Sequence, residues 1–238
     1  MNIAVPTARQ DVGLASLTVA GVSALCDPRG ALFFPHDRLL VVSDLHLEKG
    51  SSLARRGMLA PPYDTASTLG VLAAVLDHHK PDIVISLGDS FHDATGATRL
   101  PAPYRQALNG MIAGRDWYWI AGNHDPDAPH DLPGRSVSEL SFGNLLFRHE
   151  PAGVAQDGEI AGHLHPGARI VRRGRSIRRP CFACDGRRLI MPAFGAYTGM
   201  LNIRDRAYAG LFAAGDLTAY MLGRAQIYPI AGRMLRPG

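Results

Sequence analysis

Five short apolar runs, each ending in a cluster of polar residues, constrain the fold of this 238-residue chain more than any other feature. Each run has the length and the apolar content of a buried strand, and each cluster contains Asp, His, Asn or Gly. In chain order the five segments are RLLVVSDLH, PDIVISLGDS, DWYWIAGNHD, NLLFRHE and GEIAGHLHP. The repeated pattern predicts five strands, each followed by a loop that carries chemically active side chains.

Two helical segments are expected between the first three strands. PPYDTASTLGVLAAVLDHHKP has apolar residues at helical spacing, and we expect Asp64 or Thr65 to cap its start and Pro81 to stop it. PYRQALNGMIAG predicts a second helix before the third strand. Strands that alternate with helices favour an α/β layered architecture, whose ligands collect beyond the carboxyl ends of the strands. The polar clusters fall at those ends.

One domain spanning residues 1–238 is the simplest interpretation of the chain. It has no internal repeat, low-complexity tract or long linker, and its 46% hydrophobic content supports a substantial core. From Gly167 onward the sequence changes in character, with an Arg-rich, hairpin-like stretch, then RRLIMPAFGAYTG, then short strands. We expect this last third to complete the same core.

The cysteine count and the N-terminal segment predict the compartment. Three cysteines do not form a disulfide framework, and an odd count suits a reducing, cytoplasmic location. Residues 12–26 carry no charge and could imitate a signal sequence, but Asp11 precedes them and Arg9 is the only cation upstream, so we expect an N-terminal strand. No run reaches the roughly 18 apolar residues of a membrane span. A soluble cytoplasmic protein is expected.

Cys181 and Cys184 form a C-F-A-C motif. This spacing could hold zinc or a redox disulfide, but the chain has no second pair to complete a zinc site. We therefore expect a structural pair of buried thiols.

The side chains that follow the five apolar runs form a mixed set of nitrogen and oxygen ligands. Such a set suits Mn²⁺, Fe or Zn²⁺, and the absence of thiolate from it argues against a Cys-rich structural zinc site. In an extended segment Asp44 and His46 would point the same way and reach one ion, and His163 and His165 share this spacing, although irregular loops could aim them at different ions. In chain order the set is Asp44, His46, Asp89, Asn123, His124, Asp125, His149, His163 and His165.

The order of these motifs carries a family resemblance. D-x-H, G-D, G-N-H-D, a single His after a strand, and G-H-x-H occur in this order, and together they resemble the calcineurin-like metallophosphoesterases. The resemblance implies a metallo-dependent phosphatase-like fold, a four-layer αββα sandwich of two mixed β-sheets flanked by helices. It also implies one metal ion held by Asp44, His46 and His165, a second held by Asn123, His149 and His163, and Asp89 bridging both.

The implied chemistry is hydrolysis of a phosphoester at two divalent ions. Ions ~3.5–4 Å apart can share a hydroxide and clamp the phosphate oxygens during in-line attack. Mn²⁺ is the expected metal, with Fe, Zn²⁺ or Mg²⁺ as alternatives. We expect His124 to protonate the leaving oxygen or to steady the charge at phosphorus, and Asp125 to orient the His124 ring. A further metal ligand or a structural group is the alternative for His124.

Longer strings narrow the substrate. SDLHLEKGSSLARRG, PPYDT, LGDSFHD, RRPCF and MPAFGAYTG resemble the bacterial branch of this family that is associated with an ATP-dependent DNA ligase and a helicase, and that is described as DNA-damage-response endonucleases or phosphodiesterases. The resemblance implies nucleic-acid phosphodiesters as substrate, a role in DNA repair, and association with a ligase and helicase system. The alternatives are a phosphodiesterase or phosphatase for small nucleotides, and a protein-binding scaffold without catalysis, although no ligand position has been lost.

Basic residues bear on the prediction of a nucleic-acid substrate. Of the 25 basic residues only Lys49 and Lys80 are lysines, so 25 − 2 = 23 are arginines, which bind phosphate well but which also accumulate in GC-rich genomes. Between Arg169 and Arg188 there are eight arginines and one acid, Asp185. This run can follow a phosphodiester backbone or form a solvated hairpin face.

Other residues near the motifs are candidate substrate contacts. Lys49, Arg55 and Arg56 directly follow the first metal motif, so we expect them to meet substrate phosphate. His92 and its neighbour Asp93 follow Asp89 closely and could lie behind the metal site or touch substrate. Only Phe182 and Tyr197 could stack on bases nearby, which does not predict strong single-strand binding.

Overall fold

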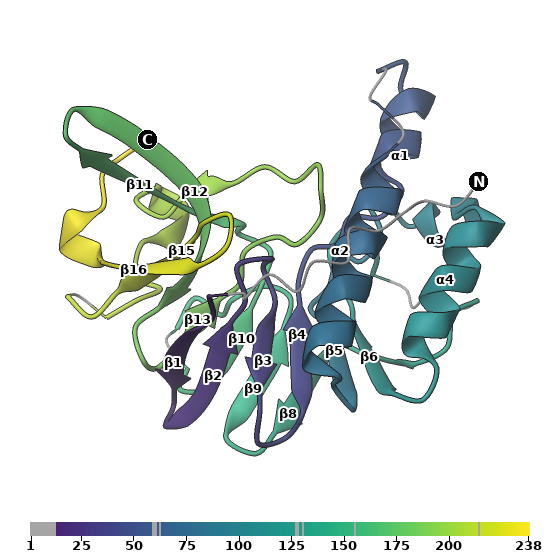
Figure 1. Cartoon of the computed structure of the whole chain (residues 1–238), viewed down its shortest axis with the longest axis horizontal. Helices are drawn as coiled ribbons and strands as arrows, with labels where there is room; N and C mark the ends of the chain where they lie inside the picture. Colours follow the sequence, from purple (N-terminus) through teal and green to yellow (C-terminus); the bar gives the residue numbers. More distant parts are fainter. Residues whose placement is uncertain are drawn as a thin grey trace.

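Two β-sheets packed face to face form the centre of the molecule (Figure 1). The computed structural model describes residues 13–58, 61, 63–126, 129, 131–154, 156–213 and 215–238. The strands of the first sheet lie in sequence order: β1 (Ala15–Val19), β2 (Val22–Cys26), β3 (Leu32–Phe34), β4 (Leu39–Val42), β5 (Ile83–Ser86), β6 (Asp116–Ile120) and β7 (Arg135–Val137). Neighbours pair antiparallel from β1 to β4 and parallel from β4 to β7. The first sheet is therefore mixed.

The second sheet is also mixed and has a more crossed order. Seven strands run β14-β11-β12-β13-β10-β9-β8, while β15 pairs with β12 and β16 pairs with β15. Its strands are β8 (Glu139–Phe142), β9 (Leu145–Arg148), β10 (Glu159–Ala161), β11 (Pro166–Arg172), β12 (Arg175–Cys184), β13 (Leu189–Ile190), β14 (Leu201–Asn202), β15 (Thr218–Leu222) and β16 (Ile227–Ala231). Parallel pairing joins β9 to β10, β10 to β13, and β11 to β14. Two mixed sheets were expected, and this prediction is confirmed.

Strand β4 shows how the layers are built, because all four of its residues are buried. Leu39 and Val41 face the core between the sheets, where Phe147 and Phe182 of the second sheet also lie. Leu40 and Val42 face the other way, into a core that the helices cover. A strand buried on both faces needs apolar residues at every position, as the sequence LLVV provides.

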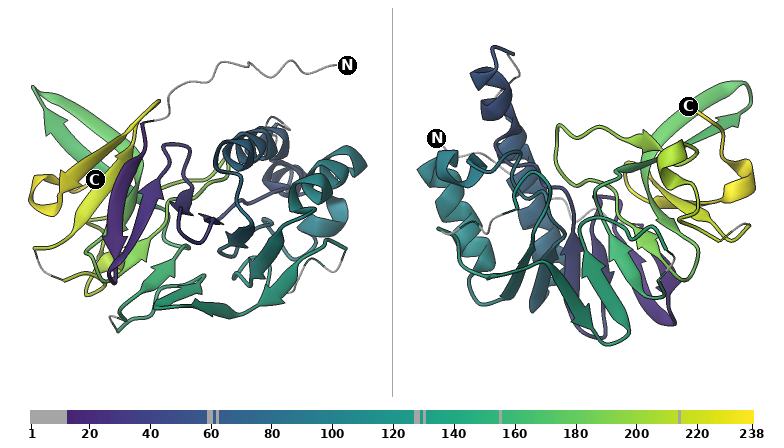
Figure 2. Two further views of the ribbon diagram at one scale, coloured as in Figure 1. Left: turned by 60° about the horizontal axis from the view of Figure 1, so that its bottom comes forward. Right: turned by 180° about the vertical axis from the view of Figure 1, so that it is seen from behind.

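In the described part of the chain, α-helices accompany the first sheet on the side away from the second sheet (Figure 2). They are α1 (Lys49–Arg55), α2 (Asp64–His79), α3 (Gly96–Arg99) and α4 (Ala102–Ile112). Leu72 and Val75 of α2 and Leu108 of α4 are buried in one core with residues of β4, β5 and β6. The expected helices in PPYDTASTLGVLAAVLDHHKP and PYRQALNGMIAG are thereby confirmed as α2 and α4.

Short 3-10 helices and loops cover the outer face of the second sheet. Tyr208 of η1 (Arg206–Tyr208) and Leu235, which follows η2 (Gly232–Met234), pack into a third core with Cys181 of β12. Within the part of the chain that the structure describes, no α-helix lies on this face. The layer outside the second sheet is thus built differently from the layer outside the first.

The expected cap of α2 is wrong. Tyr63 is the N-cap residue and makes no side-chain capping bond. The Asp64 carboxylate instead accepts a hydrogen bond from the Gly50 amide (2.9 Å), and the Thr65 hydroxyl accepts one from the Glu48 amide (2.9 Å). These side chains serve α1 and the segment before it, because tertiary partners satisfy them better than the amides of their own helix.

The expected single N-terminal strand is a hairpin of β1 and β2. Ala20 (φ 47°) and Gly21 (φ 81°) form a two-residue turn, and positive φ at both central positions is typical of hairpin turns. The prediction that the N-terminal segment is no signal sequence used Arg9, Asp11 and residue 12. These residues lie outside the described residues. Among the helices that the structure describes, none is long and apolar enough to cross a membrane.

Candidate metal centre

The five predicted strands are confirmed as β4, β5, β6, β9 and β10, and the loops that follow them converge. The loops after β4 and β5 are joined by backbone hydrogen bonds from the Asp44 amide to Gly88 O (3.2 Å) and from the His46 amide to Asp89 O (2.9 Å). The His163 amide, after β10, donates to Asp44 Oδ2 (3.1 Å). Two sheets thus contribute loops to a single cluster, which explains why its residues are scattered over 122 positions of the sequence, from Asp44 to His165.

The first group of candidate ligands is Asp44, His46 and His165. One ligand atom from each lies within 4.8 Å of the others. His165 Nε2 is 3.1 Å from Asp44 Oδ1 and 3.4 Å from His46 Nε2. Asp44 and His46 are buried and His165 is partly exposed, so the group is open to solvent on one side only.

The second group forms around His149. Its Nε2 atom lies 3.0 Å from Asn123 Oδ1, 3.3 Å from His163 Nδ1 and 3.4 Å from Asp89 Oδ1. His149 Nδ1 lies 2.8 Å from Leu87 O, which can only accept a hydrogen bond, so Nδ1 carries a proton. Burial opposes a charge on the ring, but the hydrogen bond and charge of Asp89 raise the pKa of His149 to about 9, so a metal ion would displace the proton from Nε2. His149 therefore presents a metal-binding nitrogen to the group.

Asp89 lies between the two groups. Its Oδ1 atom faces His149 of the second group, while its Oδ2 atom lies 3.8 Å from His46 Nε2 of the first. Burial opposes ionisation of Asp89, but the hydrogen bond and charge of His149 outweigh it and hold the pKa of Asp89 at about 2. Each oxygen of this ionised carboxylate faces one group.

A buried polar atom indicates that the first group fits a metal ion. Asp44 Oδ1 makes no hydrogen bond with any described residue, although leaving a buried polar atom without one costs about 1–3 kcal/mol. Burial lowers the pKa of His46 to about 3, so its imidazole is neutral at pH 7, the form that binds metal. The nitrogen and oxygen donors of both groups suit a divalent first-row ion.

Strained backbone accompanies the candidate ligands. Positive φ angles occur at Asp44 (53°), His46 (43°), Asp89 (47°), His163 (66°) and His165 (46°). A left-handed conformation costs a residue with a side chain roughly 1–2 kcal/mol, and such residues concentrate at functional sites. The extended 44–46 segment expected from the sequence is therefore wrong, although its two side chains do reach one group. His163 and His165 belong to different groups, which matches the alternative that irregular loops allowed.

Two glycines explain how the loops come so close together. A Cβ atom on Gly88 (φ 74°) would lie 2.4 Å from His149 Nδ1, and one on Gly122 would lie 2.2 Å from the backbone nitrogen of Asp89. These contacts are far shorter than side chains tolerate, so only glycine fits. Both glycines belong to the predicted motifs, G-D and G-N-H-D, and their lack of a side chain is what these motifs need at that position.

His124 and His92 stand together beside the first group. Their rings stack with centroids 5.2 Å apart, and the His124 ring lies 5.3 Å from that of His46. His124 Nε2 is 3.9 Å from Asp89 Oδ2, and 42% of its side chain is exposed. His124 is thus held at the open side of the site, where it can meet a ligand from solvent.

Asp125 has a different partner from the one expected. Its Oδ2 atom accepts a hydrogen bond from the Phe91 amide (3.0 Å), and no hydrogen bond to the His124 ring occurs among the described residues. Burial raises the pKa of Asp125 to about 7. This carboxyl supports the loop after β5. Asp125 therefore does not orient the His124 ring through a hydrogen bond, as had been expected.

The three basic candidates lie on or just after α1. Burial lowers the pKa of His92, and the positive charges of Lys49 and Arg56 lower it further, which indicates that both cations are close to the site. Arg55 donates to the Thr95 hydroxyl (3.3 Å). The neighbour of His92, Asp93, is engaged by Arg99 at 2.7 Å and serves the local loop.

Sequence reasoning missed one supporting segment, the loop 191–200 after β13. The Phe194 amide donates to Ser43 O (2.8 Å), and the Gly195 amide donates to Asp44 O (3.1 Å). The Ala196 amide reaches the Thr68 hydroxyl of α2 (3.0 Å). The loop therefore holds the strained backbone around Asp44 from behind. Gly195 was the available signal, because a Cβ there would lie 2.3 Å from Leu45 O.

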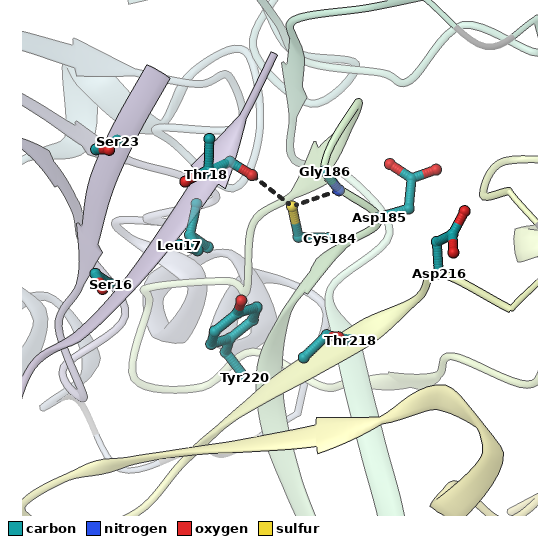
Figure 3. Close-up of a pocket in the computed structure, with 10 residues that line it drawn as sticks. All are labelled: Ser16, Leu17, Thr18, Ser23, Cys184, Asp185, Gly186, Asp216, Thr218 and Tyr220. Carbon is teal, nitrogen blue, oxygen red and sulfur yellow. Dashed lines mark hydrogen bonds between the residues drawn. The ribbon is translucent and has the colours of Figure 1, made fainter. Parts of the chain in front are cut away.

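The cysteine pair does not form a site. All three cysteines are buried free thiols, which agrees with the expected structural role. Cys181 packs in the outer core and Cys184 in the core between the sheets, so the two thiols point to opposite faces of β12. Cys184 lines an open depression of about 450 Å³ between β1 and β15, where its Sγ contacts Thr18 O (3.7 Å) and the Gly186 amide (3.3 Å) (Figure 3). That depression contains none of the candidate ligands.

A family model described as calcineurin-like phosphoesterase matches residues 37–174, which is more than half of the chain. The chain belongs to the calcineurin-like phosphoesterase family. It is therefore a hydrolase of the metallophosphoesterase type with the metallo-dependent phosphatase fold, as the motif order had indicated. No curated protein matches the sequence significantly.

Several solved structures are similar to this calcineurin-like phosphoesterase, including the following three. Pseudomonas putida nuclease MPE aligns with a TM-score of 0.71 and 26% identity, over 92% of this chain and 100% of that chain. The phosphoesterase Yfce from E. coli has a TM-score of 0.40 and 13% identity, with 81% and 98% covered. A conserved protein from Streptococcus pneumoniae TIGR4, described as a predicted phosphoesterase, has a TM-score of 0.30 and 13% identity, with 81% and 96% covered. The last two are too distant to inform the function.

Proposed function

We propose that this protein hydrolyses phosphodiester bonds of nucleic acid with two divalent metal ions. The observation that carries the proposal is the position of Asp89, whose two carboxylate oxygens face two separate groups of candidate ligands. A carboxylate in that position can bridge a pair of ions. The buried Asp44 Oδ1 atom, which makes no hydrogen bond with a described residue, adds support, because a cation held by the first group would compensate this oxygen.

The ligand roles follow the two groups. Asp44, His46 and His165 would hold one ion, and Asn123, His149 and His163 the other, with Asp89 shared. When bound, such ions would supply Lewis-acid activation of the phosphoester and a hydroxide nucleophile at neutral pH. Mn²⁺ is our proposed metal, since a mixed carboxylate, amide and imidazole set suits it, and Fe, Zn²⁺ and Mg²⁺ are the alternatives.

His124 would donate the proton to the leaving oxygen. It lies at the open side of the site, next to Asp89 and stacked on His92. An imidazole can exchange a proton near pH 7, and general acid catalysis of this kind contributes about 10²–10⁴-fold to a rate. Asp125 would act indirectly, through the loop that carries Asp89, and not by orienting the His124 ring.

Nucleic acid is the proposed substrate class. The support is the likeness to a nuclease, which extends over 92% of this chain at 26% identity. The cations beside the site add to it: Lys49 and Arg56 would meet phosphate near His92, and Arg55 would do so further along α1. His92, which has a buried and unpaired Nδ1 atom, would contact the same phosphate.

We further propose a role in DNA repair, in the cytoplasm, alongside a DNA ligase and helicase. The support is the resemblance of the longer strings, together with three free cysteines that suit a reducing compartment. Recovery of a ligase or helicase with the tagged full chain, compared with the same chain in a ligase deletion strain, tests the association. A chain that co-purifies with neither enzyme would contradict it.

A substrate panel tests the function. The protein is freed of metal with chelator, reloaded with Mn²⁺, and assayed on nicked and gapped DNA, on cyclic nucleotides and on bis(4-nitrophenyl) phosphate. We expect metal-dependent cleavage of DNA and of the aryl diester, and loss of both in Asp89→Asn. Hydrolysis of the aryl diester or cyclic nucleotides without DNA cleavage would assign small substrates instead. Fewer than one bound ion per chain after reloading, with no hydrolysis of any substrate, would favour a binding scaffold.

A further inference from the structure

The β11–β12 hairpin projects from the second sheet as a ribbon that has no neighbour over much of its length. Beyond the base, where Pro166 and Gly167 pair with β14 and 181–184 with β15, the two strands hydrogen-bond to each other. Two residues, Arg173 (φ 50°) and Gly174 (φ 73°), form its tight turn. Figure 1 and both views in Figure 2 show it extending away from the sheets, on the side opposite α1. An isolated two-stranded ribbon is only marginally stable, so this arm has little structural value of its own.

The charge of the hairpin is unusual. Residues 166–180 contain six arginines and no acid. Across the ribbon Arg172 lies directly opposite Arg175, and Arg169 lies opposite Arg178, although like charges in such positions are destabilising. None of the six forms an ion pair with a described residue, whereas Arg29, Arg38, Arg99, Arg105, Arg148, Arg187 and Arg188 each do. The ribbon therefore holds a concentration of positive charge that the protein itself does not neutralise.

Four of these arginines are also free of hydrogen bonds within the described chain. Arg169 and Arg178 donate to the carbonyls of Pro237 and Met200, which fix the base of the ribbon. The remaining four, Arg172, Arg173, Arg175 and Arg179, are exposed and have no such partner. Arginine presents donors that match phosphate, and the ribbon has no aromatic residue on which bases could stack. These features fit a phosphate backbone better than unstacked bases.

The hairpin is rooted in the candidate metal centre. Strand β11 begins at Pro166, the residue directly after His165, and β14 pairs with it there. At about 3.3 Å per residue, the strand carries Arg172 roughly 20 Å from its start. Phosphates along one strand of a duplex are spaced about 3.4 Å apart along the axis, so the arm can follow roughly six of them.

We infer that the β11–β12 hairpin binds the phosphate backbone of the nucleic acid on one side of the bond that is cleaved, and that α1 binds it on the other side. This inference rests on the proposed function and adds an extended, sequence-independent binding surface to it. A duplex and a single strand share this backbone chemistry, and the test below compares them.

The test compares two double variants with equal change in charge. Arg172→Gln/Arg175→Gln removes the pair at the tip of the hairpin. Arg38→Gln/Arg135→Gln is the matched control, since these exposed arginines lie at the starts of β4 and β7, the ends of the parallel strands opposite to the site. Each variant is assayed at 50–200 mM salt on a nicked duplex of about 30 base pairs, on a single strand of equal length and on bis(4-nitrophenyl) phosphate.

For the hairpin variant we expect KM on the duplex to rise roughly tenfold or more, and the slope of log KM against log salt to fall by about 2, one for each lost phosphate contact. Hydrolysis of the aryl diester, which is too small to reach the hairpin, should stay within about twofold of the unchanged enzyme. On a duplex with flanks shorter than about six base pairs on either side, the hairpin variant and the unchanged enzyme should have the same KM. Arg172→Lys/Arg175→Lys, which keeps the charge, should keep the salt slope.

The outcomes separate the two proposals. An enzyme that cleaves no nucleic acid but hydrolyses the aryl diester contradicts the proposed function. Cleavage of DNA with equal KM and salt slope in the hairpin and control variants overturns the hairpin inference and leaves the function standing. If the hairpin variant cleaves DNA normally but no longer binds anionic phosphatidylglycerol vesicles, the hairpin inference is also overturned, and the hairpin is assigned to a membrane surface. Arg172→Gln/Arg175→Gln could also lose hydrolysis of the aryl diester. In that case, full activity and an unchanged salt slope in Arg172→Lys/Arg175→Lys still support the inference, whereas reduced activity in both double variants overturns it.

Discussion

Substituting Gly88 by alanine should damage the metal centre although it replaces none of the candidate ligands. The new Cβ atom would lie 2.4 Å from His149 Nδ1 and 2.5 Å from His149 Cγ, so the imidazole has to move. The move breaks the contact between His149 Nδ1 and Leu87 O, and it shifts Nε2 away from Asn123 and Asp89. A left-handed alanine costs about 1–2 kcal/mol and overpacking another ~1–3 kcal/mol, so we expect a loss of roughly 2–5 kcal/mol in the free energy of unfolding.

Gly114 offers a matched control for this substitution. Its φ angle is 75°, against 74° at Gly88, but a Cβ there would meet nothing within 4 Å. Gly114→Ala should therefore lose only the conformational part, about 1–2 kcal/mol, and bind metal normally. Gly88→Ala should lower metal affinity by about 10–100-fold, because disturbed support of a ligand has effects of that size. Denaturant unfolding and Mn²⁺ titration measure the two quantities. Equal stability and equal metal affinity in the two variants would refute the reasoning.

Three further predictions follow from the fold and the site. His124→Ala should keep two bound ions and lose about 10²–10⁴-fold in kcat on DNA, and near-normal turnover would remove its proposed role as a proton donor. Asp27 is buried, which would raise its pKa, but hydrogen bonds from Arg29 and His79 outweigh burial and hold the pKa far below its usual range. A carboxyl whose pKa is lowered by folding stabilises the folded state at pH values above its unfolded pKa of about 3.9, and this stabilisation is lost as the pH falls. Asp27→Asn should therefore lower the free energy of unfolding by about 3–5 kcal/mol at pH 7 and by less below pH ~4. Denaturant unfolding between pH 2 and 7 measures the loss, and a loss that does not change with pH would contradict the prediction. Since a shared core joins both sheets, we propose that residues 1–238 form one domain. Calorimetry should then show one unfolding transition, and two separate transitions would contradict the proposal.

The strands could be predicted because their signal is local. An apolar run such as LLVV in β4 has to be buried on both faces, and the polar residues that follow mark the end of the strand. Turns and caps were harder. Ala20 gives no hint of positive φ, so the β1–β2 turn was missed, and the tertiary partners of Asp64 and Thr65 cannot be seen from the helix itself. In the described part of the last third, strands and short 3-10 helices follow β10, so this layer contains no α-helix there.

The candidate site was predictable in composition but not in geometry. The motif order pointed to the residues that lie in the two candidate groups, since each of them stands in a loop that follows a strand. The left-handed backbone at Asp44 and His46 was not predictable, because it depends on hydrogen bonds from distant segments such as Gly195. The partner of Asp125 was unpredictable for the same reason: the Phe91 amide reaches it only after β5 and β6 have paired.

A titration of Mn²⁺ into the metal-free protein, with DNA cleavage recorded at each step, tests the central claim most directly. Asp89 faces two groups of ligands, so the account predicts two ions per chain and a cleavage rate that appears as the second ion binds. The Asp89→Asn protein should bind the ions more weakly and cleave little at the same occupancy. Full cleavage with one ion per chain, or with none, would contradict the account.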